Sequence, residues 1–162
     1  VRRLVGSEMC IRDSDISINK RLISKSIEHF CRPKVYPNFL KNLLKTRPNK
    51  KIKKIWCTDS SDGLFQALQD LAMASKCKAI LHYDKIPKDK EWPKGDKWDE
   101  YYFFGGEDYE LVFSLPKKWA AKLTRLDENI NEIGFFANGE PSIEFKEKKK
   151  NALLKNTPFK HF

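Results

Sequence analysis

Residues 58–64 read Thr-Asp-Ser-Ser-Asp-Gly-Leu and lie at the junction of two segments with different apolar patterns. The six residues before this stretch, 52–57, predict a short strand. The residues after it predict a helix over 62–75, because apolar side chains recur at helical spacing, namely Leu64, Phe65, Leu68, Leu71 and Ala72. The stretch therefore marks a strand-to-helix junction, where the first backbone N–H groups of the helix lack partners within the helix.

Two carboxylates and two hydroxyls in four consecutive residues allow two interpretations of this junction. In the first, Ser or Asp side chains cap the free N–H groups of the helix and have no other role. In the second, Asp59 and Asp62 share a Mg²⁺ ion, a cation that prefers oxygen ligands and phosphate partners. Taken alone, the stretch is compatible with both interpretations.

Apolar spacing along the rest of the chain predicts further helices and strands. Three more helices are expected, at 16–31, 39–44 and 116–126. Four more strands are expected, at 79–83, 111–115, 132–136 and 142–145. We expect the last two strands to form a hairpin, because the intervening Ala137-Asn138-Gly139-Glu140 is typical of a tight turn.

Three remaining segments have less regular patterns. Residues 84–96 predict a polar loop tethered by Trp92 and Trp98, and the aromatic residues 98–104 fit either a helix or a strand. Residues 146–151 predict a polar linker. The order of elements predicts one domain of the α/β (α+β) class, with a mixed β-sheet covered by helices.

Length, composition and cysteine usage exclude several classes of protein. The chain has 162 residues, of which 12% are aromatic and 33% charged, so it can form a globular domain with a core. No apolar run approaches the ~20 residues that a membrane span needs. The four cysteines lack Cys-x-x-Cys spacing, so neither a zinc site nor a disulfide framework is expected, which fits a reducing cytoplasm.

The formal net charge of +10 raises the alternative of a nucleic-acid-binding module. However, the lysines fall in runs such as Lys50-Lys51 and Lys53-Lys54, without interleaved aromatic residues. A solvated basic face that helps to attract anionic phosphorylated ligands is the favoured interpretation, and no nucleic-acid partner is expected.

The first fourteen residues do not resemble a folded segment. Met9-Cys10-Ile11-Arg12-Asp13-Ser14 resembles the translation of a transposase mosaic-end adapter, a contaminant of sequencing libraries, and a signal peptide would need a sustained apolar core. We therefore expect residues 1–14 to be an artefact that truncates the true reading frame.

A second dense stretch reads Gly105-Gly106-Glu107-Asp108-Tyr109-Glu110-Leu111. Paired glycines allow a sharp turn or the close approach of a ligand, and two acidic residues follow them directly. By itself this stretch also fits a turn with solvated acidic side chains, and the residues alone assign no role to Asp108, Tyr109 or Glu110.

Together, the two stretches resemble the thiamine-monophosphate kinase family. Residues 59–64 resemble its Asp-x-Ser-Asp-Gly-Leu motif, and residues 105–111 match its Gly-Gly-Glu-Asp-Tyr-Glu-Leu motif at every position. Supporting matches follow in the family's order across residues 20–162: Arg32-Pro33, Ala74-Ser75, Ile86-Pro87, Ile133-Gly134 and the ending Phe159-Lys160-His161-Phe162.

The resemblance implies a fold similar to the C-terminal domain of aminoimidazole ribonucleotide synthetase-type enzymes. It implies that residues 15–162 are the C-terminal ATP- and substrate-binding domain of a two-domain kinase. The missing N-terminal domain would carry further Mg²⁺-binding aspartates and form the homodimer, so the fragment alone is expected to be inactive. Alternatives are another ATP-using enzyme of the same superfamily, of the selenophosphate synthetase or hydrogenase-maturation type.

The resemblance also implies roles for individual residues in the transfer of the γ-phosphoryl of ATP to thiamine phosphate. Asp59 and Asp62 would bind Mg²⁺, Ser61 would contact ATP, and Glu107 and Phe159 would contact thiamine phosphate. The match departs from the family at Pro158, where the family usually has glycine. No catalytic side chain is expected, because phosphoryl transfer depends mainly on alignment and charge neutralisation.

Overall fold

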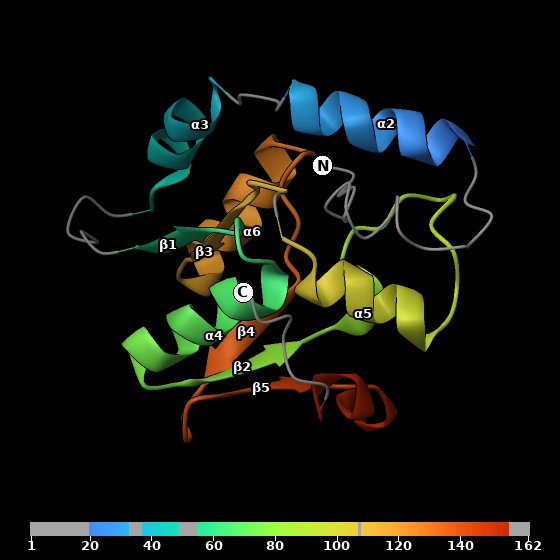
Figure 1. Ribbon diagram of the computed structural model, residues 1–162. Coiled ribbons are helices and arrows are strands. Elements are labelled where there is room, and N and C mark those ends of the chain that lie inside the picture. The colour runs from blue at the N-terminus through green and yellow to red at the C-terminus, as the bar shows by residue number, and fades with distance from the viewer. Residues whose placement is uncertain (1–19, 33–36, 49–54, 107, 156–162) are drawn as a thin grey trace.

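The structure, a computed structural model, describes residues 20–32, 37–48, 55–106 and 108–155 (Figure 1). Its helices are α2 (Lys20–Cys31), α3 (Phe39–Thr46), α4 (Leu64–Ser75), α5 (Asp96–Phe104) and α6 (Lys117–Leu126). Its strands are β1 (Trp56–Asp59), β2 (Lys78–Leu81), β3 (Leu111–Ser114), β4 (Gly134–Ala137) and β5 (Ser142–Phe145), and two 3₁₀ helices are η1 (Tyr83–Lys85) and η2 (Lys148–Lys155). The expected artefact, residues 1–14, lies outside the described residues.

The described strands form two sheets rather than the single one expected. β1 pairs antiparallel with β3, and the second sheet has the order β4-β2-β5, with β2 antiparallel to β4 and parallel to β5. In Figure 1, α4 and α5 lie over one face of the three-stranded sheet. The predicted mixture of helices with a mixed sheet is therefore confirmed.

The predicted hairpin of residues 132–145 is wrong. The two strands lie on opposite sides of β2, whose Ala79 and Leu81 are buried, so β2 is the centre of the sheet and β4 and β5 are its edges. β4 approaches β2 closely because Gly134 has no side chain, and a Cβ there would lie 2.2 Å from the carbonyl oxygen of Ile80. A local turn pattern carries no information about this competing, non-local partner.

Three other local predictions can be compared with the structure. The aromatic segment 98–104 is helical and belongs to α5. The expected tether in the polar loop is present, because Trp92 is buried and its ring meets that of Trp98 edge-to-face at 5.8 Å. The predicted linker at 146–151 is wrong from Lys148 onward, because η2 begins there and buries Leu153 in the core.

Two clusters of buried apolar side chains hold the elements together. The larger lies between α4, α5 and the three-stranded sheet, and its members are Leu22, Leu64, Leu68, Leu81, Ile86, Trp92, Tyr102, Phe103, Phe145 and Leu153. The smaller joins α3 to α6 through Leu43, Trp119 and Leu123. Successive residues of β3 point to opposite faces, so Val112 packs on the larger cluster and Phe113 on the smaller one. The β1–β3 ribbon is thus held between both cores.

No helix in the described part of the chain combines the length and apolar character that crossing a bilayer requires.

Asp99, on α5, is a buried carboxylate held by three donors. The ammonium of Lys88 lies 2.6 Å from its Oδ1, and Lys150 and the Tyr83 hydroxyl donate to its Oδ2 at 3.2 and 2.5 Å. Burial alone would raise the pKa of Asp99, but hydrogen bonds from Lys88 and Tyr83 and the charge of Lys88 outweigh it and lower that pKa. The cluster ties α5 to the loop after β2 and to η2.

We expect Asp99→Asn to lower the free energy of unfolding by about 2 kcal/mol at neutral pH, because it removes the nearest carboxylate from both Lys88 and Lys150. Since the pKa is lowered in the folded state, the stability from ionised Asp99 is complete above its unfolded pKa and is lost as pH falls through the folded pKa. Urea unfolding at pH 7 and at pH 3 measures this effect. The difference in free energy of unfolding between parent and variant should be smaller at pH 3 than at pH 7.

The control is Asp96→Asn on the same helix, whose side chain is 82% exposed and lies 4.0 Å from Lys150. It should unfold like the parent at both pH values. Equal stabilities of the Asp99 and Asp96 variants at neutral pH would contradict the assignment.

Candidate active site

The pairing of β1 with β3 brings the two dense stretches of the sequence together. Asp59, the last residue of β1, is opposite Leu111, the first residue of β3. The ladder continues by one bond, because the Ser60 N–H donates to the Glu110 carbonyl at 2.9 Å. The turn at 60–63 and the loop residues 105–106 and 108–110 therefore lie side by side at the same end of the ribbon.

Two glycines allow the backbones of these loops to touch. Gly63 has a φ of +93°, and a Cβ there would lie 3.0 Å from the carbonyl oxygens of Phe104 and Gly105. A Cβ on Gly106 would lie 2.4 Å from the carbonyl oxygen of Ser61. Side chains at either position would push the loops apart, which explains glycine in both stretches.

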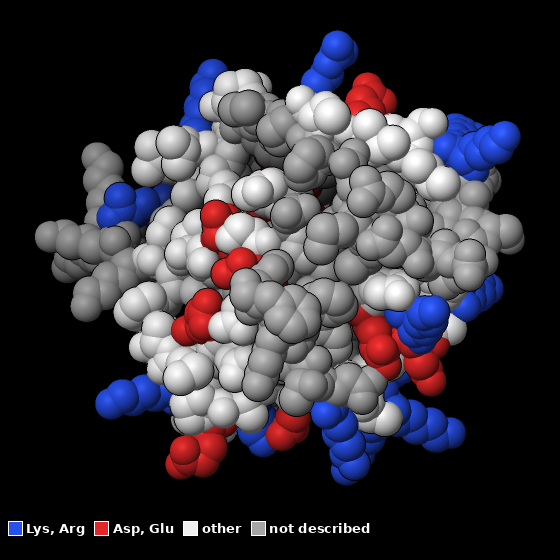
Figure 2. Space-filling model, viewed as in Figure 1, with Lys and Arg blue, Asp and Glu red and all other residues white. Residues whose placement is uncertain are grey.

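Asp59 and Asp62 are exposed at this junction, and Ser61 lies half-buried between them. The Ser61 hydroxyl donates to Oδ1 of Asp59 at 3.2 Å. Figure 2 shows acidic side chains gathered over the end of β1 and the start of α4, while lysines and arginines lie mostly toward the rim. The structure thus brings together the three residues of this stretch that the sequence proposed as ligands.

The simple capping interpretation is wrong. The N-cap of α4 is Gly63, and among the described residues no side chain makes a capping hydrogen bond to it. The strand runs on to Asp59, so the polar residues sit on a tight turn before the helix and not within its first turn. Their side chains are consequently available for a ligand.

Asp59 and Asp62 offer oxygen ligands for a hard cation, but they are too few to fill its coordination sphere. Within the described residues, no three His, Cys, Asp or Glu side chains converge to hold a metal ion by themselves. Two carboxylates alone still match Mg²⁺, which keeps several waters and takes substrate phosphates as further ligands. Close by on β1, burial and then the charge of Asp59 raise the pKa of the Cys57 thiol.

Sequence reasoning missed a buried polar pair beneath this surface. Ser60 is fully buried and Asp108 is 3% exposed, and the Ser60 hydroxyl donates to Oδ1 of Asp108. Strand alternation continued backward from Val112 would have placed Glu110 and Asp108 on the inner side. Tyr109, at a φ of +46°, breaks that extended path, which is why the pattern did not suffice.

The other two predicted ligand residues, Glu107 and Phe159, lie outside the described residues. Glu107 is flanked by Gly106 and Asp108, so the chain on both sides of it belongs to the loop beside the acidic turn. The roles of both residues stay predictions.

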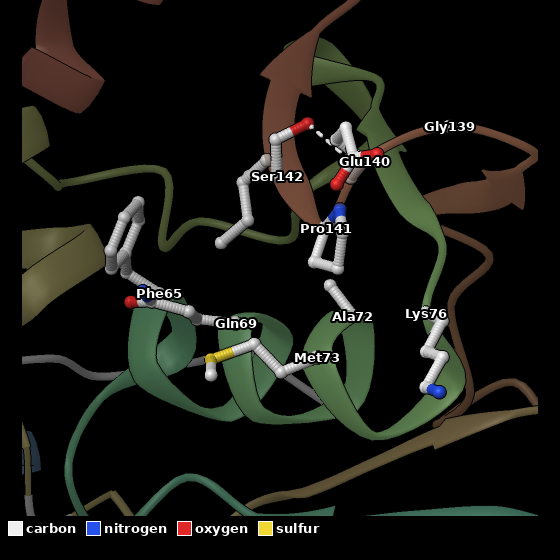
Figure 3. Close-up of a pocket in the computed structure, with 10 residues that line it drawn as sticks. Phe65, Gln69, Ala72, Met73, Lys76, Gly139, Glu140, Pro141 and Ser142 are labelled. Carbon is white, nitrogen blue, oxygen red and sulfur yellow. Dashed lines mark hydrogen bonds between the residues drawn. The ribbon is translucent and has the colours of Figure 1, made fainter.

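A pocket of about 740 Å³ opens on the flank of α4, away from this junction. Phe65, Gln69 and Met73 of α4, with Lys76 just after it, face the segment 139–143. There the Ser142 hydroxyl donates to the Glu140 carbonyl at 3.1 Å (Figure 3). Most of the residues that line it are apolar or glycine. It lacks Asp59, Ser61 and Asp62 and is therefore not the candidate site.

Known proteins similar to this chain share one activity in their names. The thiamine-monophosphate kinase of Prochlorococcus marinus is 31% identical over 147 residues, which are 91% of this chain and 44% of that protein. The thiamine-monophosphate kinase of Nitrosopumilus maritimus is 35% identical over 109 residues, 64% of this chain and 34% of that protein. No protein-family model matches the sequence.

Two solved structures share the fold. The structure of AaThiL complexed with AMPPCP and TMP matches with a TM-score of 0.57 and 25% identity, over 88% of this chain and 43% of the other. Thiamine-monophosphate kinase from Stenotrophomonas maltophilia K279a matches with a TM-score of 0.50 and 27% identity, over 56% and 30%. At its longest matches the chain spans a little under half the length of its relatives.

Proposed function

Because the chain belongs to the thiamine-monophosphate kinase family, we propose that it forms part of an enzyme that phosphorylates thiamine phosphate with ATP, yielding thiamine diphosphate. The observation that carries this proposal is the junction of the two loops. There Asp59 and Asp62 lie exposed and Ser61 half-buried, none of them caps α4, and residues 105–106 and 108–110 lie beside them. The related structure with AMPPCP, an ATP analogue, and TMP supports the choice of reactants.

We propose that the carboxylates of Asp59 and Asp62 bind Mg²⁺, since both are exposed oxygen donors on one tight turn. Bound there, Mg²⁺ supplies charge neutralisation between the phosphates of two anionic reactants. Ser61 orients the Asp59 carboxylate through their 3.2 Å hydrogen bond and can turn its hydroxyl toward a phosphate oxygen of ATP. The uncapped N–H groups at the start of α4 favour anions at the same place.

The substrate side of the proposed site consists of Glu107 and Phe159. A carboxylate can pair with the cationic thiazolium or accept from the aminopyrimidine, and an aromatic ring favours a cation on its face. In this proposal, catalysis depends on the alignment of the acceptor phosphate with ATP and needs no side chain of this chain to act as a general base.

The remaining ligands and the homodimer contacts are proposed to lie in a second domain, since the relatives are about twice as long as the match. In this proposal residues 15–162 form the ATP- and substrate-binding domain, residues 1–14 take no part, and the enzyme acts in the cytoplasm without a nucleic-acid partner.

Calorimetric titration of the purified 162-residue chain tests the proposal. We expect AMPPCP to bind only in the presence of Mg²⁺, because the exposed carboxylates otherwise repel its phosphates. Thiamine phosphate should bind more tightly than thiamine, and mixing chain, ATP, Mg²⁺ and thiamine phosphate should yield no thiamine diphosphate.

Each outcome has a distinct meaning. Failure of both AMPPCP and thiamine phosphate to bind would contradict the proposed function of this domain. Turnover by the chain alone would contradict only the need for a second domain.

A further inference from the structure

Beneath the exposed cluster, Ser60 and Asp108 form a buried polar contact between two loops 48 residues apart in the sequence. Ser60 is 0% exposed and Asp108 3% exposed. Neither reaches the surface that would meet ATP or thiamine phosphate, so neither is a candidate ligand. Their contact nevertheless joins the segment carrying Asp59, Ser61 and Asp62 to the segment carrying Glu107.

The Ser60 hydroxyl is satisfied from both sides. Its single hydrogen can go to Oδ1 of Asp108 or to the Glu110 carbonyl oxygen at 3.1 Å, and a carboxylate oxygen is the stronger acceptor. Its oxygen accepts the Glu110 N–H at 3.1 Å. The Ser60 side chain therefore adds hydrogen bonds between the two segments at the point where the backbone pairing of β1 and β3 ends.

The Ser60–Asp108 contact lies between the turn at 60–63 and the loop before β3, so it affects how these two segments lie relative to one another. Asp59 and Ser61 flank Ser60 in the chain. Asp59 is exposed and Ser61 half-buried, whereas Ser60 between them is buried and bonded to Asp108. The turn is closed on the other side by the Gly63 N–H, which donates to the Ser60 carbonyl at 3.0 Å. All three groups of Ser60 (N–H, carbonyl and hydroxyl) are thus used to shape the turn.

Stability alone does not account for a carboxylate at position 108. Desolvating a carboxylate costs several kcal/mol, and an apolar pair of similar volume is often as stable or more so. A hydrogen-bonded pair, unlike an apolar one, has a single well-defined geometry.

We propose that Ser60 and Asp108 are a positioning pair that sets the distance between the proposed Mg²⁺–ATP ligands in the turn 59–62 and the loop residues 105–106 and 108–110. The proposal rests on the proposed function for the ligands on each side. It assigns no contact with substrate to either residue.

Hydrogen exchange and Mg²⁺–AMPPCP binding of the whole chain test the pair in Ser60→Ala, Asp108→Leu and Asp108→Asn. We expect amides in 59–63 and 105–111 to exchange about tenfold faster in Ser60→Ala and Asp108→Leu, since each loses a hydrogen bond to a charged group. Asp108→Asn keeps an oxygen that accepts from Ser60, so its exchange rates in the two loops should stay within about twofold of those of the parent. Nucleotide affinity should fall in the same order.

The matched control is Thr46→Val in the smaller core, which removes a buried hydroxyl that accepts from Trp119 Nε1 at 3.1 Å. It should lower stability without speeding exchange in the two loops. The double variant Ser60→Ala/Asp108→Leu should speed exchange in them by less than the product of the two single effects, because the two changes share the Ser60–Asp108 hydrogen bond.

Unchanged loop exchange in Ser60→Ala would overturn the proposal, and so would a uniform acceleration across the chain that Thr46→Val reproduces. If Asp108→Leu fails to fold, Ser60→Ala and Asp108→Asn still give the comparison. If the parent binds no nucleotide but loop exchange speeds up in the variants as expected, the proposed function fails, while the finding that Ser60 and Asp108 hold the two loops together remains.

Discussion

Replacing Gly106 with alanine should lower the melting temperature of the chain by about 5 °C or more and weaken Mg²⁺-dependent binding of AMPPCP at least about tenfold. The added Cβ would lie 2.4 Å from the carbonyl oxygen of Ser61, a backbone atom that cannot rotate away. The two loops must therefore separate by roughly 1 Å to reach ordinary contact, and such displacements of binding groups are costly. Thermal unfolding and calorimetry measure both effects.

Gly134→Ala is the matched control for this clash. Its Cβ would lie 2.2 Å from the Ile80 carbonyl oxygen, in the sheet that carries no proposed ligand. Gly134→Ala should lower the melting temperature by a similar amount. Below that temperature it should bind Mg²⁺–AMPPCP with the affinity of the parent. A Gly106→Ala variant with unchanged nucleotide affinity would show that the close approach of the two loops is not required for binding.

The elements that were predicted correctly are those whose signal is local. α4 follows from the spacing of Leu64, Leu68 and Leu71, which are all buried on one side. The structure shifts its start from residue 62 to Leu64, because Gly63 is the N-cap and strand β1 extends to Asp59. The local sequence therefore indicated which residues are candidate ligands. It did not indicate that they lie in a turn before α4, because that depends on where β1 ends.

The features that were not predicted depend on contacts between distant segments. Nothing in residues 132–145 indicates that β5 pairs with β2, and nothing in either dense stretch indicates that β1 pairs with β3. The buried pair of Ser60 and Asp108 is a consequence of that second pairing. Among four neighbouring polar residues, the pairing decides which one faces inward and which face solvent.

Replacing Asp62 with asparagine should weaken Mg²⁺-dependent binding of AMPPCP about ten- to a hundredfold, because one of two proposed carboxylate ligands becomes neutral. Turnover of a kinase containing this chain should fall about a hundredfold or more for the same reason. Asp59→Asn should act similarly, and the double variant should bind no nucleotide. Calorimetric titrations at several Mg²⁺ concentrations measure the loss, which excess Mg²⁺ should partly reverse in the single variants.

The effect of Asp62→Asn on folding separates a ligand from a structural residue. Asp62 is exposed just before α4, so its loss removes a helix-dipole interaction worth under about 1 kcal/mol, offset in part by reduced repulsion toward Asp59. The melting temperature without Mg²⁺ should hardly change, whereas the rise on adding Mg²⁺ and AMPPCP should disappear, since a ligand stabilises only a state that binds it. Asp70→Asn, an exposed carboxylate further along α4, should retain that rise. A full Mg²⁺-dependent rise in Asp62→Asn would exclude Asp62 as a metal ligand.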